Sequence, residues 1–289
     1  MTIRFAEPIS RLPPRNENDP PSPGLLLWSD PAKQLECSYA PFEHLNDCAR
    51  IVLVGITPGR TQMNLAVEAA RTALLVGDSV EEALRETKRK ASFGGGMRRP
   101  LVQMLDLFGY ARRLGIPTSD HLWGSANDQV HFCSLLKYPV FVGGRGYNGK
   151  PDMLRHPRLN ALLREEFVID VARLPVDAIL VPLGETVLKV ILKLQEEGLV
   201  PQQLLWWEGR AVALPHPAGG NGESIALALQ IPFPPLQEYV ESQWRKYLQN
   251  ESWISKGRSG PQDETNYKMR RQNYWERLSA TRLAHGLPE

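Results

Sequence analysis

The stretch Ile51-Val52-Leu53-Val54-Gly55-Ile56-Thr57-Pro58-Gly59 decides the fold of this chain. Its first four residues form a continuous apolar run, which is typical of a strand covered on both faces of a sheet. The run ends in a Gly-x-x-Pro-Gly turn. Because ligand sites of open α/β folds lie at the carboxyl ends of parallel strands, we expect this turn to border a site.

Three further apolar runs repeat this pattern along the chain. They cover residues 131–136, 178–181 and 211–214, and segments with helical spacing lie between them. Strands that alternate with helices form parallel sheets covered on both sides, because β–crossover–β units close that way. The sequence therefore predicts a three-layer α/β/α fold with a central, mainly parallel, four-stranded sheet.

Composition divides the chain into three parts. Residues 1–45 are rich in proline, so we expect an extended arm there rather than regular elements. Residues 46–235 carry the alternating pattern and form the predicted α/β domain. Residues 236–289 form a helical, basic C-terminal extension. Within it, 236–248 have the spacing of an amphipathic helix, and the stretch beyond Trp253 is polar and expected to be partly flexible.

The overall composition excludes several classes of protein. A hydrophobic content of 42% and a charged content of 23% are typical of soluble globular domains, and we expect a cytoplasmic protein with no membrane contact. No apolar run approaches the ~20 residues that span a bilayer, and the N-terminus lacks the apolar stretch of a signal peptide. Three cysteines without a Cys-x-x-Cys pair and six histidines without paired ligand spacing predict neither a metal nor a cofactor.

Basic residues are unevenly distributed although the net charge is only +2. One group brackets the Phe93-Gly94-Gly95-Gly96 loop and includes Arg98 and Arg99, and another lies in the C-terminal extension. Such local stripes neutralise phosphates even in a nearly neutral protein. The alternative for each group is an ordinary solvated helix face.

Four motifs occur in an order that resembles the uracil-DNA glycosylase superfamily. The resemblance covers roughly residues 49 to 230, and it rests on the Gly55–Gly59 turn, on Phe93, on the segment from Ser134 to Pro139, and on His216-Pro217. It implies the three-layer fold given above. It also implies a nucleotide that is flipped out of the DNA, because a stacked base cannot reach a catalytic group.

The resemblance implies a role for each motif. Thr57 would position the attacking water, and His216 would donate to the departing base, where negative charge develops. Residues expected to contact the base are Gly55, Ile56, Pro58, Gly59, Phe93, Ser134 and Lys137. Residues expected to contact the DNA strand are Arg60, Arg98, Arg99, Gly219, Gly220 and Asn221.

Three departures from the superfamily pattern bear on the substrate. Thr57 stands where relatives commonly have Asp, Glu or Asn, and a hydroxyl orients water but is no general base near neutral pH. Ser134 stands where several families have Asn, which weakens pyrimidine discrimination. The loop after His216 reads Pro-Ala-Gly-Gly-Asn-Gly, whereas relatives commonly have His-Pro-Ser.

These observations predict a monomeric DNA glycosylase without a cofactor. It would hydrolyse the N-glycosidic bond of a flipped uracil, or of a damaged or modified pyrimidine, in duplex or single-stranded DNA and leave an abasic site. The biological setting would be base-excision repair or defence against modified foreign DNA. Two alternatives stay open: a catalytically inactive DNA-binding protein that keeps the fold, and a small-molecule enzyme that acts on free nucleosides or nucleotides.

Overall fold

A three-stranded parallel sheet forms the centre of the molecule in this computed structural model, which describes residues 5–230, 232–248 and 264–286. Its strands are β3 (Ile51–Gly55), β4 (Val130–Ser134) and β7 (Ile179–Pro182), and their order is β4-β3-β7. The register places Gly55 opposite Ser134. The predicted parallel sheet is thus confirmed for three of the expected strands.

The fourth expected strand is reduced to a single bridge. Leu214 runs parallel to Leu183: its N–H donates to the carbonyl of Pro182 (3.0 Å), and its own carbonyl accepts from Gly184 (2.8 Å). The chain therefore lies next to β7 but pairs only briefly. Pro215 and Pro217 follow at once, and proline has no N–H with which to continue a ladder.

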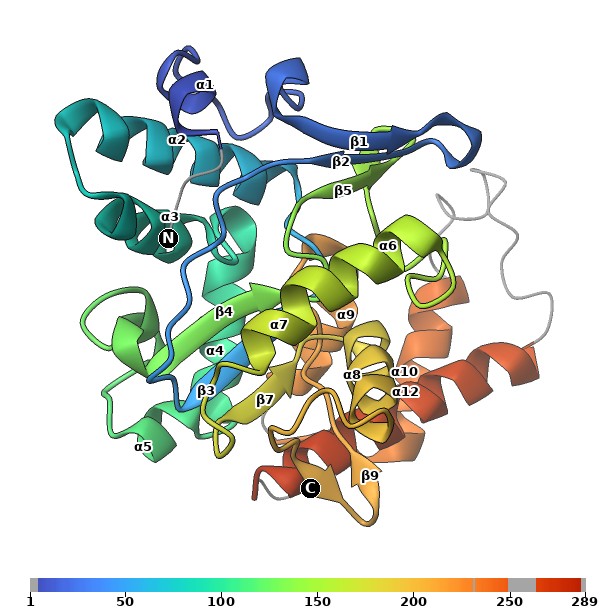
Figure 1. The fold of residues 1–289 in the computed structure, drawn as a ribbon. Coiled ribbons are helices and arrows are strands. Elements are labelled where there is room, and N and C mark those ends of the chain that lie inside the picture. The colour runs from blue at the N-terminus through green and yellow to red at the C-terminus, as the bar shows by residue number, and fades with distance from the viewer. Residues whose placement is uncertain (1–4, 231, 249–263, 287–289) are drawn as a thin grey trace.

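Helices cover both faces of the parallel sheet, as expected (Figure 1). The side chains of β3 alternate between these two faces. Val52 and Val54 pack with one set of helices, whereas Ile51 and Leu53 pack with the other. The first set comprises α2 (Arg60–Val76), α3 (Val80–Ala91), α6 (Pro157–Leu162) and α8 (Glu185–Glu196). The helical course of α6 continues through η6 (Leu163–Val168) and α7 (Ile169–Val171), which pack on the same face. The second comprises α4 (Arg98–Leu107), α5 (Tyr110–Leu114), α9 (Gly222–Ala228), α10 (Leu236–Leu248) and α12 (Glu264–Ala284).

The N-terminal segment corrects the expectation of an extended arm without regular elements. It contains the short helix α1 (Ala6–Ser10) and the strands β1 (Leu26–Asp30) and β2 (Leu35–Ser38). These strands pair antiparallel with β5 (Val140–Val142) and β6 (Arg145–Gly146) in the order β1-β2-β5-β6, across the top of Figure 1. The prolines of the segment lie before β1, between the two strands or after β2, so they leave the ladder intact.

The C-terminal extension contains a second helix whose bounds the sequence pattern did not give. Residues 236–248 form α10 as expected, and α12 packs against it, although the stretch beyond Trp253 was expected to be partly flexible. Residues 249–263, including Trp253, lie outside the described residues. None of the helices within the described ranges is long and apolar enough to cross a membrane.

The remaining elements are short. They are the hairpin β8 (Trp206–Trp207) and β9 (Arg210–Ala211) and the 3-10 turns η1 (Pro23–Leu25), η2 (Pro31–Lys33), η3 (Gly95–Met97), η4 (Ser119–Trp123), η5 (Asn127–Gln129) and η7 (Gly219–Asn221).

Candidate functional site

A cavity of about 230 Å³ lies at the carboxyl ends of the parallel strands. The turn after β3, the end of β4, the loop after α3 and the loop after Leu214 each supply part of its wall. They contribute Gly55, Ser134, Phe93 and His216 respectively. The structure therefore brings together one residue from each of the four motifs that the sequence analysis selected.

Gly55 leaves the space in which two of these side chains meet. A Cβ atom at this position would lie 3.3 Å from the Phe93 ring and 3.4 Å from Oγ of Ser134. The distance to the ring is tighter than most van der Waals contacts, so a side chain here would push the ring aside, while it would only just touch the hydroxyl. Gly55 thus lets an aromatic surface and a hydroxyl border the same small volume.

Phe93 is held in an unfavourable backbone conformation. Its φ is +50°, in the left-handed region that a residue with a side chain adopts at a cost of about 1–2 kcal/mol. The carbonyls on both sides of it are fixed by buried donors: Trp123 Nε1 donates to Ser92 (2.8 Å) and Gln62 Nε2 donates to Gly94 (2.8 Å). These bonds keep the Phe93 ring at the cavity wall.

Thr57 uses its hydroxyl to tie the first turn to the connection between β4 and β5. Oγ1 donates to the carbonyl of Tyr138 (3.0 Å) and accepts from the N–H of Val140 (3.2 Å). A hydroxyl has one proton and two lone pairs, so a single lone pair remains for a water molecule. Thr57 lines the cavity, but it has no proton left to donate there.

His216 is the residue with the clearest chemical capacity. Its Nδ1 accepts a hydrogen bond from the N–H of Ala218 (3.2 Å), and burial lowers its pKa, so the ring stays neutral at physiological pH. With Nδ1 as acceptor, the ring proton resides on Nε2. Among the described residues Nε2 has no hydrogen-bond partner, so this N–H can donate to a ligand in the cavity.

Charged residues that the sequence analysis did not assign to the base form another part of the wall. Lys88 is buried, and its Nζ donates to the carbonyls of Phe42 (3.1 Å) and His44 (2.8 Å). Burial lowers its pKa to about 8, although the charge of Asp170 offsets part of this effect. The sequence did contain a signal, because Lys88 shares the buried face of α3 with Leu84 and Ala91.

Lys137, which was expected to contact the base, lines the same cavity. It pairs with Glu166 (2.6 Å) and with Asp170 (3.0 Å). Burial lowers the pKa of Lys137, but the charges of Asp170 and Glu166 outweigh burial and raise it overall. The ammonium group therefore remains charged and is held by two carboxylates.

Further residues complete the wall. Ile56, Pro58 and Gly59 line it as expected, and the N–H of Gly59 donates to Oε1 of Gln62 (3.1 Å). Lining residues that sequence reasoning missed include Phe42, Gln62, Tyr147, Phe167 and Asp170. Their sequence surroundings carry no motif, because they come from separate helices and loops that only the tertiary fold brings together.

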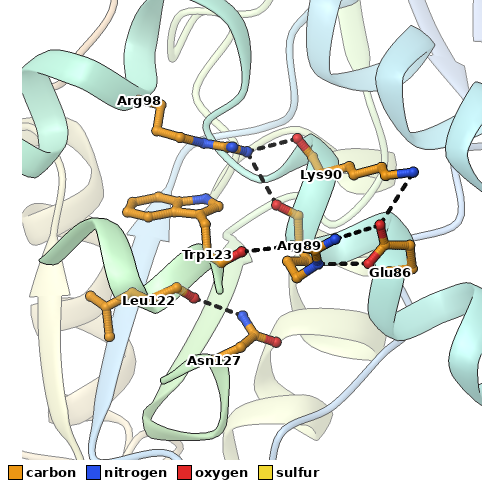
Figure 2. A network of polar contacts seen from close by, with 7 residues as sticks. All are labelled: Glu86, Arg89, Lys90, Arg98, Leu122, Trp123 and Asn127. Atoms are coloured by element: carbon orange, nitrogen blue, oxygen red, sulfur yellow. Dashed lines mark hydrogen bonds and ion pairs between the residues drawn. The ribbon is translucent and has the colours of Figure 1, made fainter. Parts of the chain in front are cut away.

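Arg98 forms internal contacts, although it was expected to contact DNA. Its guanidinium donates to the carbonyls of Arg89 (3.1 Å) and Lys90 (2.8 Å), and it lies 5.3 Å from the centre of the Trp123 ring. Figure 2 shows this network, in which Arg89 and Lys90 in turn pair with Glu86. The structure thus gives Arg98 a role in joining α3, α4 and η4.

The other residues proposed to contact DNA differ in their surroundings. Arg60 donates to the carbonyl of Gly144 (2.7 Å), whereas the side chain of Arg99 is exposed. Gly219, Gly220 and Asn221 form the turn η7 before α9. No group of three or more potential metal ligands occurs in the described parts of the chain.

A second cavity of about 460 Å³ adjoins the first. Both are lined by Ile56, Tyr147, His216 and Ala218, so they meet at His216. The second cavity is bordered by the start of α8, by Asn221 of η7 and by one side of α12. The candidate site is therefore a bipartite hollow with a histidine at its junction.

Comparison with known proteins gives one clear relationship. The chain is 34% identical over 231 residues to the uncharacterized protein YoxB of Bacillus subtilis (strain 168), and the alignment covers 76% of this chain and 85% of YoxB. No family model and no solved structure matches the chain.

Proposed function

The chain belongs to the family of the uncharacterized Bacillus protein YoxB, and from the geometry of its cavity we propose that it is a DNA glycosylase. The proposed reaction is hydrolysis of the bond between C1′ of the sugar and a ring nitrogen of a flipped uracil, or of a damaged or modified pyrimidine. The oxygen of water adds to C1′ as the bonding electron pair leaves with the base. The proton that the water loses ends on the released base, and an abasic site remains.

The observation that carries this proposal is the neutral His216 at the cavity. When the N-glycosidic bond breaks, negative charge spreads from the ring nitrogen to the neighbouring carbonyl oxygen of the base. A fixed N–H aimed at that oxygen lowers the barrier because it needs no reorganisation, and loss of such a donor typically costs ~10²–10³ in rate. The Nε2–H of His216 is available for this contact.

The size and wall of the cavity support a base as its ligand. A cavity of roughly 150 Å³ holds a benzene ring, and about 230 Å³ leaves additional room for ring substituents. Phe93 supplies an aromatic surface, and Ser134 supplies a hydroxyl for a polar edge. This volume accommodates a pyrimidine ring together with its exocyclic oxygens.

The order of the segments at the sheet supports the resemblance to uracil-DNA glycosylases. The first turn follows the middle strand β3, Ser134 ends β4 on one side of it, and His216 follows the segment that bridges to β7 on the other. We infer that this bridging segment corresponds to the fourth strand of a glycosylase-like sheet.

Thr57 favours a second candidate, a DNA-binding protein that no longer hydrolyses. Its only hydroxyl proton is donated to Tyr138, and a hydroxyl is a poor base near neutral pH. Water would then be positioned without being deprotonated. Such a protein would bind DNA in a salt-sensitive manner and release no base.

Mass spectrometry of bases released from DNA separates these candidates. The purified chain is incubated with uracil-containing, deaminated and 5-substituted DNAs, in parallel with His216→Ala and with His121→Ala, whose ring bonds Ser125 and lies outside both cavities. We expect release that falls ~10²-fold or more in His216→Ala and persists in His121→Ala.

Each other outcome has a definite meaning. Release that is unchanged in His216→Ala would remove this histidine from the mechanism. Binding without release from any DNA would support the inactive DNA-binding protein. Turnover of free nucleosides that DNA does not inhibit would instead support an enzyme for small molecules.

A further inference from the structure

Helix α12 lies outside the region that resembles glycosylases, yet it borders the second cavity. Tyr274, Arg277, Leu278 and Thr281 all line that cavity, and His216 lines it as well. A helix near the C-terminal end of the chain thus borders the same cavity as the residue to which the proposed chemistry is assigned.

Contacts with the α/β core fix this helix in place. Leu278 is buried in the cluster formed by β3, α4 and α9. Trp275 Nε1 donates to the carbonyl of Pro234 (2.7 Å), and the hydroxyl of Tyr274 bonds that of Ser224 in α9. The side of α12 that borders the cavity is therefore held in a defined position.

Most of the basic residues of α12 already have internal partners. Lys268 pairs with Glu241 and Glu264, Arg271 pairs with Glu223, and the guanidinium of Arg282 is buried and donates to the carbonyl of Ala228. These cations are committed to packing α12 against α9 and α10.

Arg277 differs from these three. Its guanidinium lies 5.0 Å from the centre of the Tyr274 ring, which orients it, and within the described ranges it forms no ion pair. It lines the cavity and remains exposed to solvent. Arg270 provides a natural comparison, because it is exposed on the same helix but lines neither cavity at His216.

We propose that α12 and the second cavity form a binding site for a phosphate of the nucleic-acid strand whose base occupies the first cavity, with Arg277 as the cation that contacts it. The neutral donors Asn148, Thr186 and Asn221 line the same cavity and suit phosphate oxygens. A base and its phosphate are covalently linked, and two cavities that meet at His216 match this connection. The inference rests on the proposed function in taking DNA as the ligand, but it requires binding and not hydrolysis.

Glu185 also lines the second cavity and forms no ion pair with Arg277 among the described residues. A carboxylate repels a phosphate, so removing the charge of Glu185 should change the DNA affinity in the opposite direction to removing the charge of Arg277. Glu185→Gln should strengthen DNA binding, whereas Arg277→Gln should weaken it. A general change in folding would not produce opposite effects in the two variants.

The test measures the salt dependence of DNA binding by the full chain. Fluorescence anisotropy with a single-stranded and a duplex oligonucleotide gives the slope of log K against log salt. Loss of one phosphate contact should reduce this slope by about 0.7 for single strands and about 0.9 for duplex DNA. We expect this reduction in Arg277→Gln and not in the matched control Arg270→Gln.

A neutral methylphosphonate, placed at each phosphate near the target nucleotide in turn, locates the contact. We expect one position to weaken binding by the wild-type chain and to have no further effect on Arg277→Gln. Equal slopes for the wild type and Arg277→Gln, equal losses in the two arginine variants, or no DNA binding would each overturn the inference. Binding of a free nucleoside monophosphate that depends on Arg277, while DNA binding does not, would assign the site to small molecules and overturn it as well.

The two proposals fail in different ways. If the slope changes as expected but the wild-type chain releases no base from any DNA, the phosphate site stands and the glycosylase activity is refuted. If bases are released and neither the slope nor the methylphosphonate profile depends on Arg277, the glycosylase activity stands and the phosphate site is refuted.

Discussion

Replacing the buried Lys88 with methionine tests the electrostatics of the cavity wall. Burial lowers the pKa of Lys88 from the ordinary 10.5 to about 8, so between these pH values the unfolded chain holds a proton that the folded chain lacks. The contribution of Lys88 to the free energy of unfolding therefore rises with pH in this interval and is constant below pH 8. One pKa unit corresponds to about 1.4 kcal/mol, so this contribution changes by about 3 kcal/mol across the whole interval.

The assay is urea unfolding, followed by tryptophan fluorescence, at a series of pH values from 7 to 10.5. We expect the stability of the wild type minus that of Lys88→Met to increase by about 3 kcal/mol between pH 8 and 10.5. Taking this difference cancels the tyrosines and cysteines whose titration does not depend on Lys88, whereas Cys133 is coupled to the Lys88 charge and is replaced by serine in both proteins. Lys90→Met is the matched control, because Lys90 lies on the same helix, is half exposed and pairs with Glu86.

A difference that stays flat across this range would refute the reasoning, because it would mean that the Lys88 ammonium is as well solvated in the folded chain as in water. A difference that falls with pH would mean that Asp170 and the two backbone carbonyls stabilise the charge by more than burial destabilises it. The same pH dependence in Lys90→Met would show that the effect does not arise at the cavity.

Three further outcomes are expected. Gly55→Ala places a methyl group 3.3 Å from the Phe93 ring, so we expect the free energy of unfolding in urea to fall by about 1–3 kcal/mol. Calorimetry should also show weaker binding of free bases, and unchanged affinity would mean that Gly55 does not shape the base-binding cavity. In an NMR titration, the His216 ring should have a pKa below 6.5 because of its burial, and a value at or above 6.5 would contradict the neutral donor. Arg98→Met should destabilise the fold by about 1–3 kcal/mol and leave the salt dependence of DNA binding unchanged, whereas a smaller slope would restore Arg98 as a phosphate contact.

Local patterns predicted those parts of the fold that local physics determines. The apolar run 51–54 became β3 because each of its side chains is buried on one face or the other. The capping box at Ser79 and Glu82 is present, with reciprocal hydrogen bonds at the start of α3. Convergence of Gly55, Ser134 and His216 followed from a general property of parallel sheets, whose strand ends meet at one edge.

The parts that sequence reasoning missed depend on distant partners. β2 forms its ladder with β5, about one hundred residues later, and nothing within 35–38 identifies that partner. α12 is mostly polar and buries few apolar side chains, so its periodicity is weak. The contacts of an arginine side chain are equally a tertiary property. Arg98 and Arg277 each have one apolar and one charged neighbour in the sequence, yet of these two only Arg98 donates to backbone carbonyls.

The backbone and the side chain of Phe93 favour different residues at this position. The left-handed backbone favours glycine, whereas the cavity wall requires the aromatic ring. Glycine at this position would relieve about 1–2 kcal/mol of conformational cost, but it would remove the ring from the cavity. The ring also packs in the core beside Phe132, so its loss costs core packing as well as the cavity wall. A protein that needs either contact must keep the unfavourable backbone. Among descendants of this chain, glycine at position 93 would therefore mark those lineages in which neither the cavity nor the packing around Phe132 depends on the ring.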